Sequence, residues 1–162
     1  MPQRVMSRTP SNEQYNVVCP DTDGETVIAI VGSRTFPFDL FPDKCIAEVE
    51  AAVEATGVVV DRLVSGGADG VDTAAAEWAE QRGVPVTEIE PDYDAYGKAA
   101  PFKRNSTIVE RADVVVALWN GSSKGTLDTL AKAKRALGED RVAIHGIGGA
   151  SPSLDAVPER SL

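Results

Sequence analysis

The sequence predicts an α/β protein with a Rossmann-like fold, a three-layer sandwich whose mostly parallel central sheet carries helices on both faces. Short apolar runs of strand length alternate along the chain with longer segments of helical periodicity, as a parallel sheet with helical crossovers requires. Three of these runs lead into glycine-bearing turns, which is typical of the sheet edge where such folds bind ligands. With 162 residues, the chain is long enough for one domain with its own core.

The predicted strands are apolar runs bounded by turn residues. The first, Val27–Val31, reads Val-Ile-Ala-Ile-Val and leads into Gly32. Its β-branched residues favour an extended strand that is buried on both faces. The other predicted strands cover residues 58–64, 85–89, 113–118 and 141–147.

The predicted helices lie between these strands and are closed by glycines. They cover residues 42–56, 70–82, 104–111 and 126–137. Gly57, Gly83 and Gly138 follow three of them, where a C-cap glycine is favoured. Thr126 is the expected N-cap of the last helix. Residues 92–103 are rich in Tyr, Gly, Ala and Pro and are expected to form a loop.

The sequence predicts one domain between two tails. Residues 25–148 hold every predicted strand and helix, whereas residues 1–24 and 149–162 lack hydrophobic periodicity and are expected to be flexible. Cys19 and Cys45 belong to no metal-like cluster, so we expect free thiols and no metal. The N-terminus lacks the apolar core of a signal peptide and no segment is long enough to span a membrane, so we expect a cytoplasmic protein.

The net charge argues against two classes of partner. A formal charge of −9 gives an overall field that repels nucleic acid and anionic membranes. A small anion can still bind, because turn amides and a few cations act locally. Single-stranded DNA binding is therefore the least favoured of the functions considered.

The turn after the second strand, Ser65-Gly66-Gly67-Ala68-Asp69-Gly70, carries the strongest single signal. Its small residues let backbone N–H groups approach an anion, and the helix that follows adds its positive end. The alternative is that the glycines only permit a tight turn, with Asp69 or Asp72 capping the helix.

The other two turns add side chains that suit a phosphate. In Gly32-Ser33-Arg34, the arginine follows the first strand, where its fork of donors can lean over the crevice rather than into solvent. Gly121-Ser122-Ser123-Lys124-Gly125-Thr126 adds hydroxyls, and its lysine is either a phosphate partner or a solvated charge. The spacing is not that of a P-loop.

Arg104-Asn105, at the start of the expected short helix, supplies a further cation. With Tyr93 and Tyr96 in the preceding loop, this segment can offer a surface for a base or ribose. The alternative is that the tyrosines only pack the loop onto the domain. No nucleophile–histidine–acid arrangement or obvious carboxylate pair emerges, so the sequence assigns no catalytic residue.

Taken in order, these motifs resemble the SLOG superfamily and, within it, the YspA-type family. The resemblance covers approximately residues 27–144. It rests on Gly32-Ser33-Arg34-Thr35-Phe36, Ser65-Gly66-Gly67-Ala68-Asp69-Gly70-Val71-Asp72, Ala76-Glu77-Trp78-Ala79, Tyr96-Gly97-Lys98-Ala99-Ala100, Arg104-Asn105 and the loop from Gly121 to Thr126.

The resemblance implies a Rossmann-like protein that binds nucleotides or nucleotide-derived molecules and forms a homodimer. Relatives include cytokinin-activating phosphoribohydrolases, whose Pro-Gly-Gly-x-Gly-Thr loop is followed by an acidic residue three positions after the Thr. That position is Thr129 here, and Asp128 is one residue short. A helix turns by about 100° per residue, so Asp128 is expected to point elsewhere. Arg104 is the counterpart of their helix-borne arginine.

These observations favour a sensor or carrier that binds a nucleotide, or an NAD- or ADP-ribose-like molecule, without a required cofactor. The enzymatic alternative is an N-glycosidic hydrolase of nucleoside monophosphates, in which Asp69, Asp72 or Asp128 would have to serve as the acid. The candidate ligand-binding residues are Gly32, Ser33, Arg34, Ser65, Gly66, Gly67, Asp69, Gly70, Asp72, Tyr96, Arg104, Asn105, Ser122, Ser123, Lys124, Gly125 and Thr126.

Overall fold

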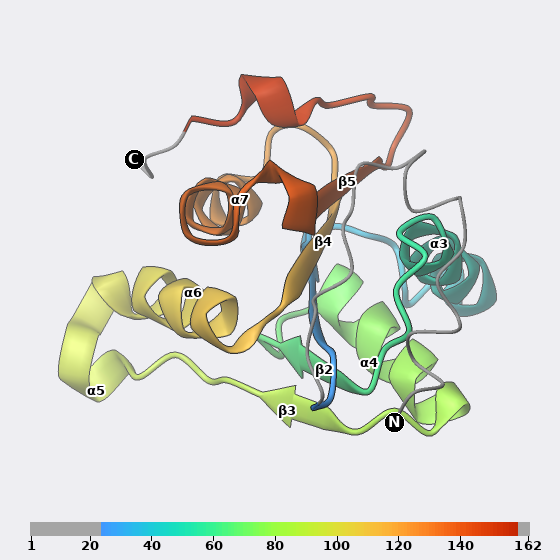
Figure 1. Cartoon of the computed structure of the whole chain (residues 1–162), viewed down its shortest axis with the longest axis horizontal. Coiled ribbons are helices and arrows are strands. Elements are labelled where there is room, and N and C mark those ends of the chain that lie inside the picture. Colours follow the sequence, from blue (N-terminus) through green and yellow to red (C-terminus); the bar gives the residue numbers. More distant parts are fainter. Residues whose placement is uncertain (1–23, 159–162) are drawn as a thin grey trace.

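The central element of the computed structural model is an all-parallel sheet of five strands, and the structure describes residues 24–158 (Figure 1). The strands are β1 (Val27–Gly32), β2 (Arg62–Ser65), β3 (Val86–Glu88), β4 (Val114–Trp119) and β5 (Val142–Gly146). Their order across the sheet is β3-β2-β1-β4-β5, with β1 paired to both β2 and β4. Residues 1–23 of the predicted N-terminal tail, Cys19 among them, lie outside the described residues.

Helices cover both faces of this sheet, which confirms the predicted α/β three-layer sandwich. The α-helices are α3 (Pro42–Glu54), α4 (Val71–Arg82), α5 (Tyr93–Tyr96), α6 (Ala100–Arg111) and α7 (Lys124–Leu137), and the 3-10 helices are η1 (Gly97–Ala99), η2 (Glu139–Arg141) and η3 (Leu154–Ala156). Figure 1 shows α3 and α4 on one side of the sheet and α6 and α7 on the other.

The two cores follow from the alternation of side chains along β1. Ile28 and Ile30 face α3 and α4, where they join Val49 and Trp78 in one buried cluster. Ala29 and Val31 face the opposite way, into a second cluster with residues of α6 and α7. Every residue of β4 is buried, as expected for an inner strand covered on both faces.

The arrangement of the strands determines where a crevice forms. From β1 the chain continues to β2 and β3 on one side, whereas β4 and β5 extend the sheet on the other side. The loops that leave β1 and β4 therefore diverge to opposite faces, and a ligand crevice forms between them at the carboxyl edge of the sheet.

Several predicted boundaries were wrong. The strand expected over 58–64 begins only at Arg62, because the chain before it first completes a turn in which the Gly57 N–H donates to the Glu54 carbonyl oxygen and the Val58 N–H donates to Thr56 Oγ1. The helix expected over 104–111 begins at Ala100, with a proline in its first turn, where a missing N–H costs nothing. The first helix ends at Glu54, before the predicted Thr56.

The last helix begins earlier than its sequence suggested. Its N-cap is Ser123 rather than Thr126, and α7 starts at Lys124. The N-cap of α4 is Gly70, and neither Asp69 nor Asp72 caps it through a side chain. Both corrections matter for the site, because the position of each N-cap determines which backbone N–H groups at the start of α4 and α7 are available to a ligand.

Part of the segment expected to be a C-terminal tail packs against the domain. Val157 is 1% exposed and belongs to the core beneath α7. The Lys134 ammonium donates hydrogen bonds to the carbonyl oxygens of Leu154 and Val157. None of the helices in residues 24–158 is both long and apolar enough to cross a membrane.

Candidate functional site

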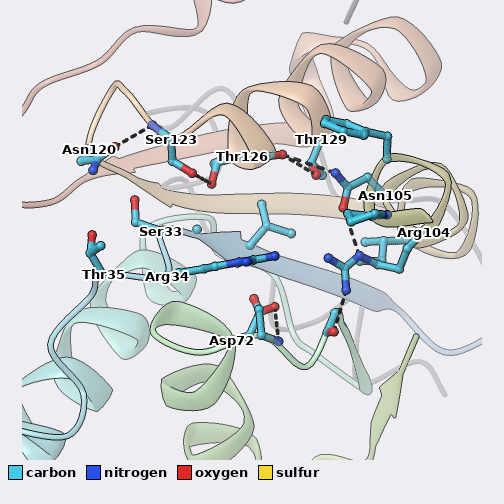
Figure 2. Close-up of a pocket in the computed structure, with 18 of the residues that line it drawn as sticks. Ser33, Arg34, Thr35, Asp72, Arg104, Asn105, Asn120, Ser123, Thr126 and Thr129 are labelled. Atoms are coloured by element: carbon cyan, nitrogen blue, oxygen red, sulfur yellow. Dashed lines mark hydrogen bonds between the residues drawn. The ribbon is translucent and has the colours of Figure 1, made fainter. Parts of the chain in front are cut away.

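A cavity of about 530 Å³ opens at the carboxyl edge of the sheet, at the crevice that the strand order creates. Its walls come from the loops after β1, β2 and β4, from the first turns of α4 and α7, and from α6 (Figure 2). The predicted residues that line it are Gly32, Ser33, Arg34, Gly66, Asp72, Arg104, Asn105, Ser122, Ser123, Gly125 and Thr126. Segments that are far apart in the sequence thus share one cavity.

The remaining predicted residues do not line this cavity: Ser65, Gly67, Asp69, Gly70, Tyr96 and Lys124. Tyr96 is 51% exposed, and the Lys103 ammonium lies 5.7 Å from its ring centroid. Gly70 is required for packing rather than for ligand contact. It has a φ of +78°, and a Cβ there would lie 2.4 Å from the Ser33 carbonyl oxygen.

The glycine-rich turn after β2 is largely satisfied by the protein itself. The Gly67 N–H donates to Ser65 Oγ, and the Ala68 N–H donates to Asp72 Oδ2 over 3.1 Å. Arg104 Nη1 donates to the Gly66 carbonyl oxygen over 2.7 Å. Two amides that the sequence offered to a phosphate are therefore already paired, so this turn is a poorer anion cradle than predicted.

Asp72 is the carboxylate inside the cavity. Its side chain is buried, and burial raises the pKa of Asp72 from its ordinary value of 3.8 to about 6. The Ala68 N–H, Arg104 and Arg34 act in the opposite direction, whereas Glu88 adds to the rise. The cavity therefore combines one acid of raised pKa with two arginines.

The two guanidinium groups differ in how firmly they are held. Arg104 is bound to Gly66, to the Ile89 carbonyl and to Asn105 Oδ1, and burial lowers its pKa. The Arg34 guanidinium has no hydrogen-bond or ion-pair partner within residues 24–158. In Figure 2 both groups point toward each other from opposite ends of the cavity.

Ser33 is the clearest sign of a missing partner. The residue is 2% exposed and lines the cavity, and its Oγ has no hydrogen-bond partner in the described part of the chain. A buried hydroxyl without a partner costs free energy, because its hydrogen bonds to water are lost without replacement. A polar ligand group in the cavity would restore them.

The beginning of α7 offers open donors beside Ser33. The first N–H groups of a helix have no helical acceptor, and in α7 these belong to Lys124, Gly125 and Thr126. Ser123 provides no side-chain cap for them, because its Oγ pairs with Thr126 Oγ1 at 3.1 Å. The positive end of this 14-residue helix therefore faces the cavity.

Sequence reasoning missed several cavity residues, chiefly Asn120, Thr35 and Phe102. Asn120 shapes the third turn, since its Oδ1 accepts the N–H groups of Ser122 and Ser123. An asparagine directly before a glycine is a recognisable turn signal that could have revealed it. The 45% exposed Phe102 lies in the segment that was predicted to be a loop.

Asp128 and Thr129 lie as the helix geometry predicted. Thr129 lines the cavity, whereas Asp128 does not. Asp128 is buried behind the cavity wall, where it accepts hydrogen bonds from Asn105 Nδ2 at 3.0 Å and Lys132 Nζ at 2.8 Å. It supports Asn105 and is not available as an acid in the cavity. Among residues 24–158, no group of three or more His, Cys, Asp or Glu side chains could hold a metal ion.

The fold and the crevice place the chain among Rossmann-like α/β proteins with a cavity at the switch between β1 and β4. Residues 26–96 match the model of the YAcAr family, the YspA, cpYpsA-related SLOG family. The resemblance inferred from the motifs is therefore confirmed over this span, and it indicates a nucleotide-related ligand that is bound or processed. No curated protein matches the chain.

Proposed function

We propose that this protein binds a nucleotide or a nucleotide-derived molecule, such as an NAD- or ADP-ribose-like compound, in the cavity at the carboxyl edge of the sheet. The observation that carries the proposal is the buried Ser33 Oγ, which has no partner among residues 24–158 and lies in a cavity that two arginines and the open start of α7 also line. A small-molecule role as sensor or carrier suits the absence of any assigned catalytic group.

The phosphate of such a ligand is best served near Ser33 and the first turn of α7. Here an oxyanion would accept the Ser33 hydroxyl and the N–H groups of Gly125 and Thr126, with the free Arg34 guanidinium as its charge partner. Asp72 and the paired amides of the Ser65–Gly70 turn make the opposite wall less suitable for negative charge.

An N-glycosidic hydrolase remains the second candidate, since Asp72 is the acid that lines the cavity among the three considered. In that reaction water would add to the ribosyl C1′ and the base would leave with a proton, giving ribose 5-phosphate. A carboxyl with a pKa of about 6 suits proton transfer near neutral pH. Release of free base from a nucleoside monophosphate by wild type, but not by Asp72→Asn, would favour the hydrolase.

The test is calorimetric titration with nucleoside mono- and diphosphates, ADP-ribose and NAD, using wild type, Ser33→Ala and Arg34→Gln. Arg135→Gln serves as the matched control, because Arg135 is exposed near the end of α7 remote from the cavity. We expect saturable binding in wild type and in the control. Loss of the charge-assisted contact in Arg34→Gln should weaken it about 10- to 100-fold.

Two results would overturn the proposal. One is the lack of saturable heat with every member of the panel. The other is equal affinity in wild type, Ser33→Ala and Arg34→Gln, which would place the binding site elsewhere on the molecule.

A further inference from the structure

The carboxylate of Asp72 has one oxygen in use and one open. Oδ2 accepts the Ala68 N–H over 3.1 Å, whereas Oδ1 has no hydrogen-bond partner within residues 24–158. The side chain is 8% exposed and lines the cavity. Among residues 24–158, Ser33 Oγ is the only buried side-chain oxygen or nitrogen without a partner, so Asp72 Oδ1 is open to the cavity, where a donor on a ligand can reach it.

The charged groups around Asp72 leave this oxygen without a direct ion pair. Arg104 and Arg34 attract the carboxylate, and Glu88 repels it. Neither guanidinium forms an ion pair with Asp72 in the described part of the chain. Arg104 is fixed by its bonds to Gly66 and Ile89 and is therefore not free to approach.

The chemistry of this position excludes a phosphate and favours hydroxyl donors. A carboxylate is an acceptor only, so it repels an oxyanion and binds O–H or N–H groups. Asp72 lies on the wall of the cavity opposite Ser123 and Thr126 (Figure 2). A ligand whose phosphate sits at the first turn of α7 would thus turn its sugar toward Asp72.

We propose that Asp72 is a specificity-determining residue that accepts hydrogen bonds from the ribose hydroxyls of the ligand and thereby selects ribonucleotides over 2′-deoxyribonucleotides. This inference rests on the proposed function, because it requires that a nucleotide occupies the cavity. The inference adds the kind of sugar in the ligand and the atom that binds it, Oδ1 of Asp72. In the complex, Oδ1 would then accept a hydrogen bond from a ribose hydroxyl while Oδ2 keeps the Ala68 N–H.

The experiment compares adenosine 5′-monophosphate with 2′-deoxyadenosine 5′-monophosphate by calorimetry at pH 7.5. The variants are Asp72→Asn, which keeps an acceptor for the Ala68 N–H, and Asp94→Asn, an exposed aspartate on α5 as the control. Wild type and the control should prefer the ribonucleotide about 10- to 100-fold, the range of a charged hydrogen bond. In Asp72→Asn the preference should fall to within about threefold, with little change for the deoxynucleotide.

The outcomes separate this inference from the proposed function. Equal affinity of wild type for both nucleotides, or an unchanged preference in Asp72→Asn, overturns the role of Asp72 while leaving nucleotide binding intact. If neither of these nucleotides nor any other nucleotide of the panel binds wild type, the proposed function fails and the inference fails with it. Circular dichroism of both variants checks that the comparison concerns folded protein.

Discussion

Arg104 Nη1 lies 2.7 Å from the carbonyl oxygen of Gly66, to which it donates a hydrogen bond. This contact joins α6 to the turn after β2, across 38 residues of sequence. A Cβ at position 66 would lie 2.6 Å from the same nitrogen, so the lack of a side chain there is what admits the guanidinium. One wall of the cavity therefore depends on a glycine and an arginine together.

Gly66→Ala and Arg104→Ala should be strongly non-additive. Each removes the same hydrogen bond and should lower the free energy of unfolding by about 1–2 kcal/mol. Because the double variant cannot lose the contact twice, it should be more stable than the sum of the single effects by about 1 kcal/mol. Urea unfolding of the four proteins measures this coupling, and simple additivity would show that the contact does not hold the wall.

Gly70→Ala should destabilise the protein much more than Gly83→Ala. Both glycines have positive φ, +78° and +70°, so each alanine would be strained by about 1–2 kcal/mol. At Gly83 nothing lies within 4 Å of the added Cβ, whereas at Gly70 the backbone oxygens of Ser33 and Arg34 lie at 2.4 and 2.6 Å. Thermal unfolding of the two variants compares backbone strain alone, in Gly83→Ala, with strain plus a steric clash, in Gly70→Ala. An equal loss of stability in both variants would contradict the close packing of the turns around Gly70.

Asp72→Asn should stabilise the protein near neutral pH. Because the folded state raises the pKa of Asp72 from 3.8 to about 6, the unfolded chain loses this proton first as the pH rises. The folded state then binds more protons, so stability falls between about pH 4 and pH 6 and the penalty stays constant above. A rise in the pKa of Asp72 from 3.8 to about 6 corresponds to a loss of unfolding free energy on the order of 2–3 kcal/mol.

Unfolding of wild type and Asp72→Asn from pH 4 to pH 8 tests this dependence. The difference between them should be near zero at pH 4 and should grow up to about pH 6. Asp94→Asn, at an exposed position, controls for the substitution of an aspartate by asparagine. A difference that shrinks as the pH rises would show that the charged form of Asp72 is stabilising instead.

Val157→Ala should show that the C-terminal segment is part of the folded domain. Val157 is 1% exposed, and the loss of its two methyl groups should cost about 2 kcal/mol, since each buried carbon contributes about 0.8 kcal/mol and a void remains. Val59→Ala is the matched control, because Val59 is 39% exposed. Equal and small effects in denaturant unfolding would indicate that residue 157 does not pack against the core.

The sheet and its crevice could be predicted because their signals are local. β-Branched runs such as Val27–Val31 and Val114–Val116 favour strands whatever their neighbours. Glycine-bearing turns after three strands mark the edge where a parallel sheet meets a ligand. The family resemblance, confirmed over residues 26–96, rests on the same turns.

The side chains of the site were harder to predict, because their directions depend on tertiary structure. Lys124 proved to be the first residue of α7 and does not line the cavity, whereas a loop position would have left it free to turn inward. Tyr96 is the last residue of the short helix α5, and its side chain is exposed. The extension of α6 back to Ala100 could not be predicted, because Pro101 and its neighbours have the composition of a loop. Proline nevertheless suits the first turn of a helix.

The pairing of the Ser65–Gly70 amides was equally invisible in the sequence. Asp72 was expected either to cap α4 or to bind a ligand. Instead, its carboxylate accepts a hydrogen bond from the N–H of Ala68, a residue of the turn. Ser33 gave no signal of its own beyond its place after Gly32. Its importance emerged only when the structure showed its Oγ to be buried without a partner among the described residues.

An NMR titration of backbone amides with adenosine 5′-monophosphate tests the central claim most directly. The account predicts saturable shifts of the Ser33, Gly125 and Thr126 amides, which lie where the phosphate is proposed to bind. The Arg34→Gln variant should lose these shifts at the same ligand concentration, whereas Arg135→Gln should keep them. Shifts confined to a different part of the surface, or none at all, would contradict the account.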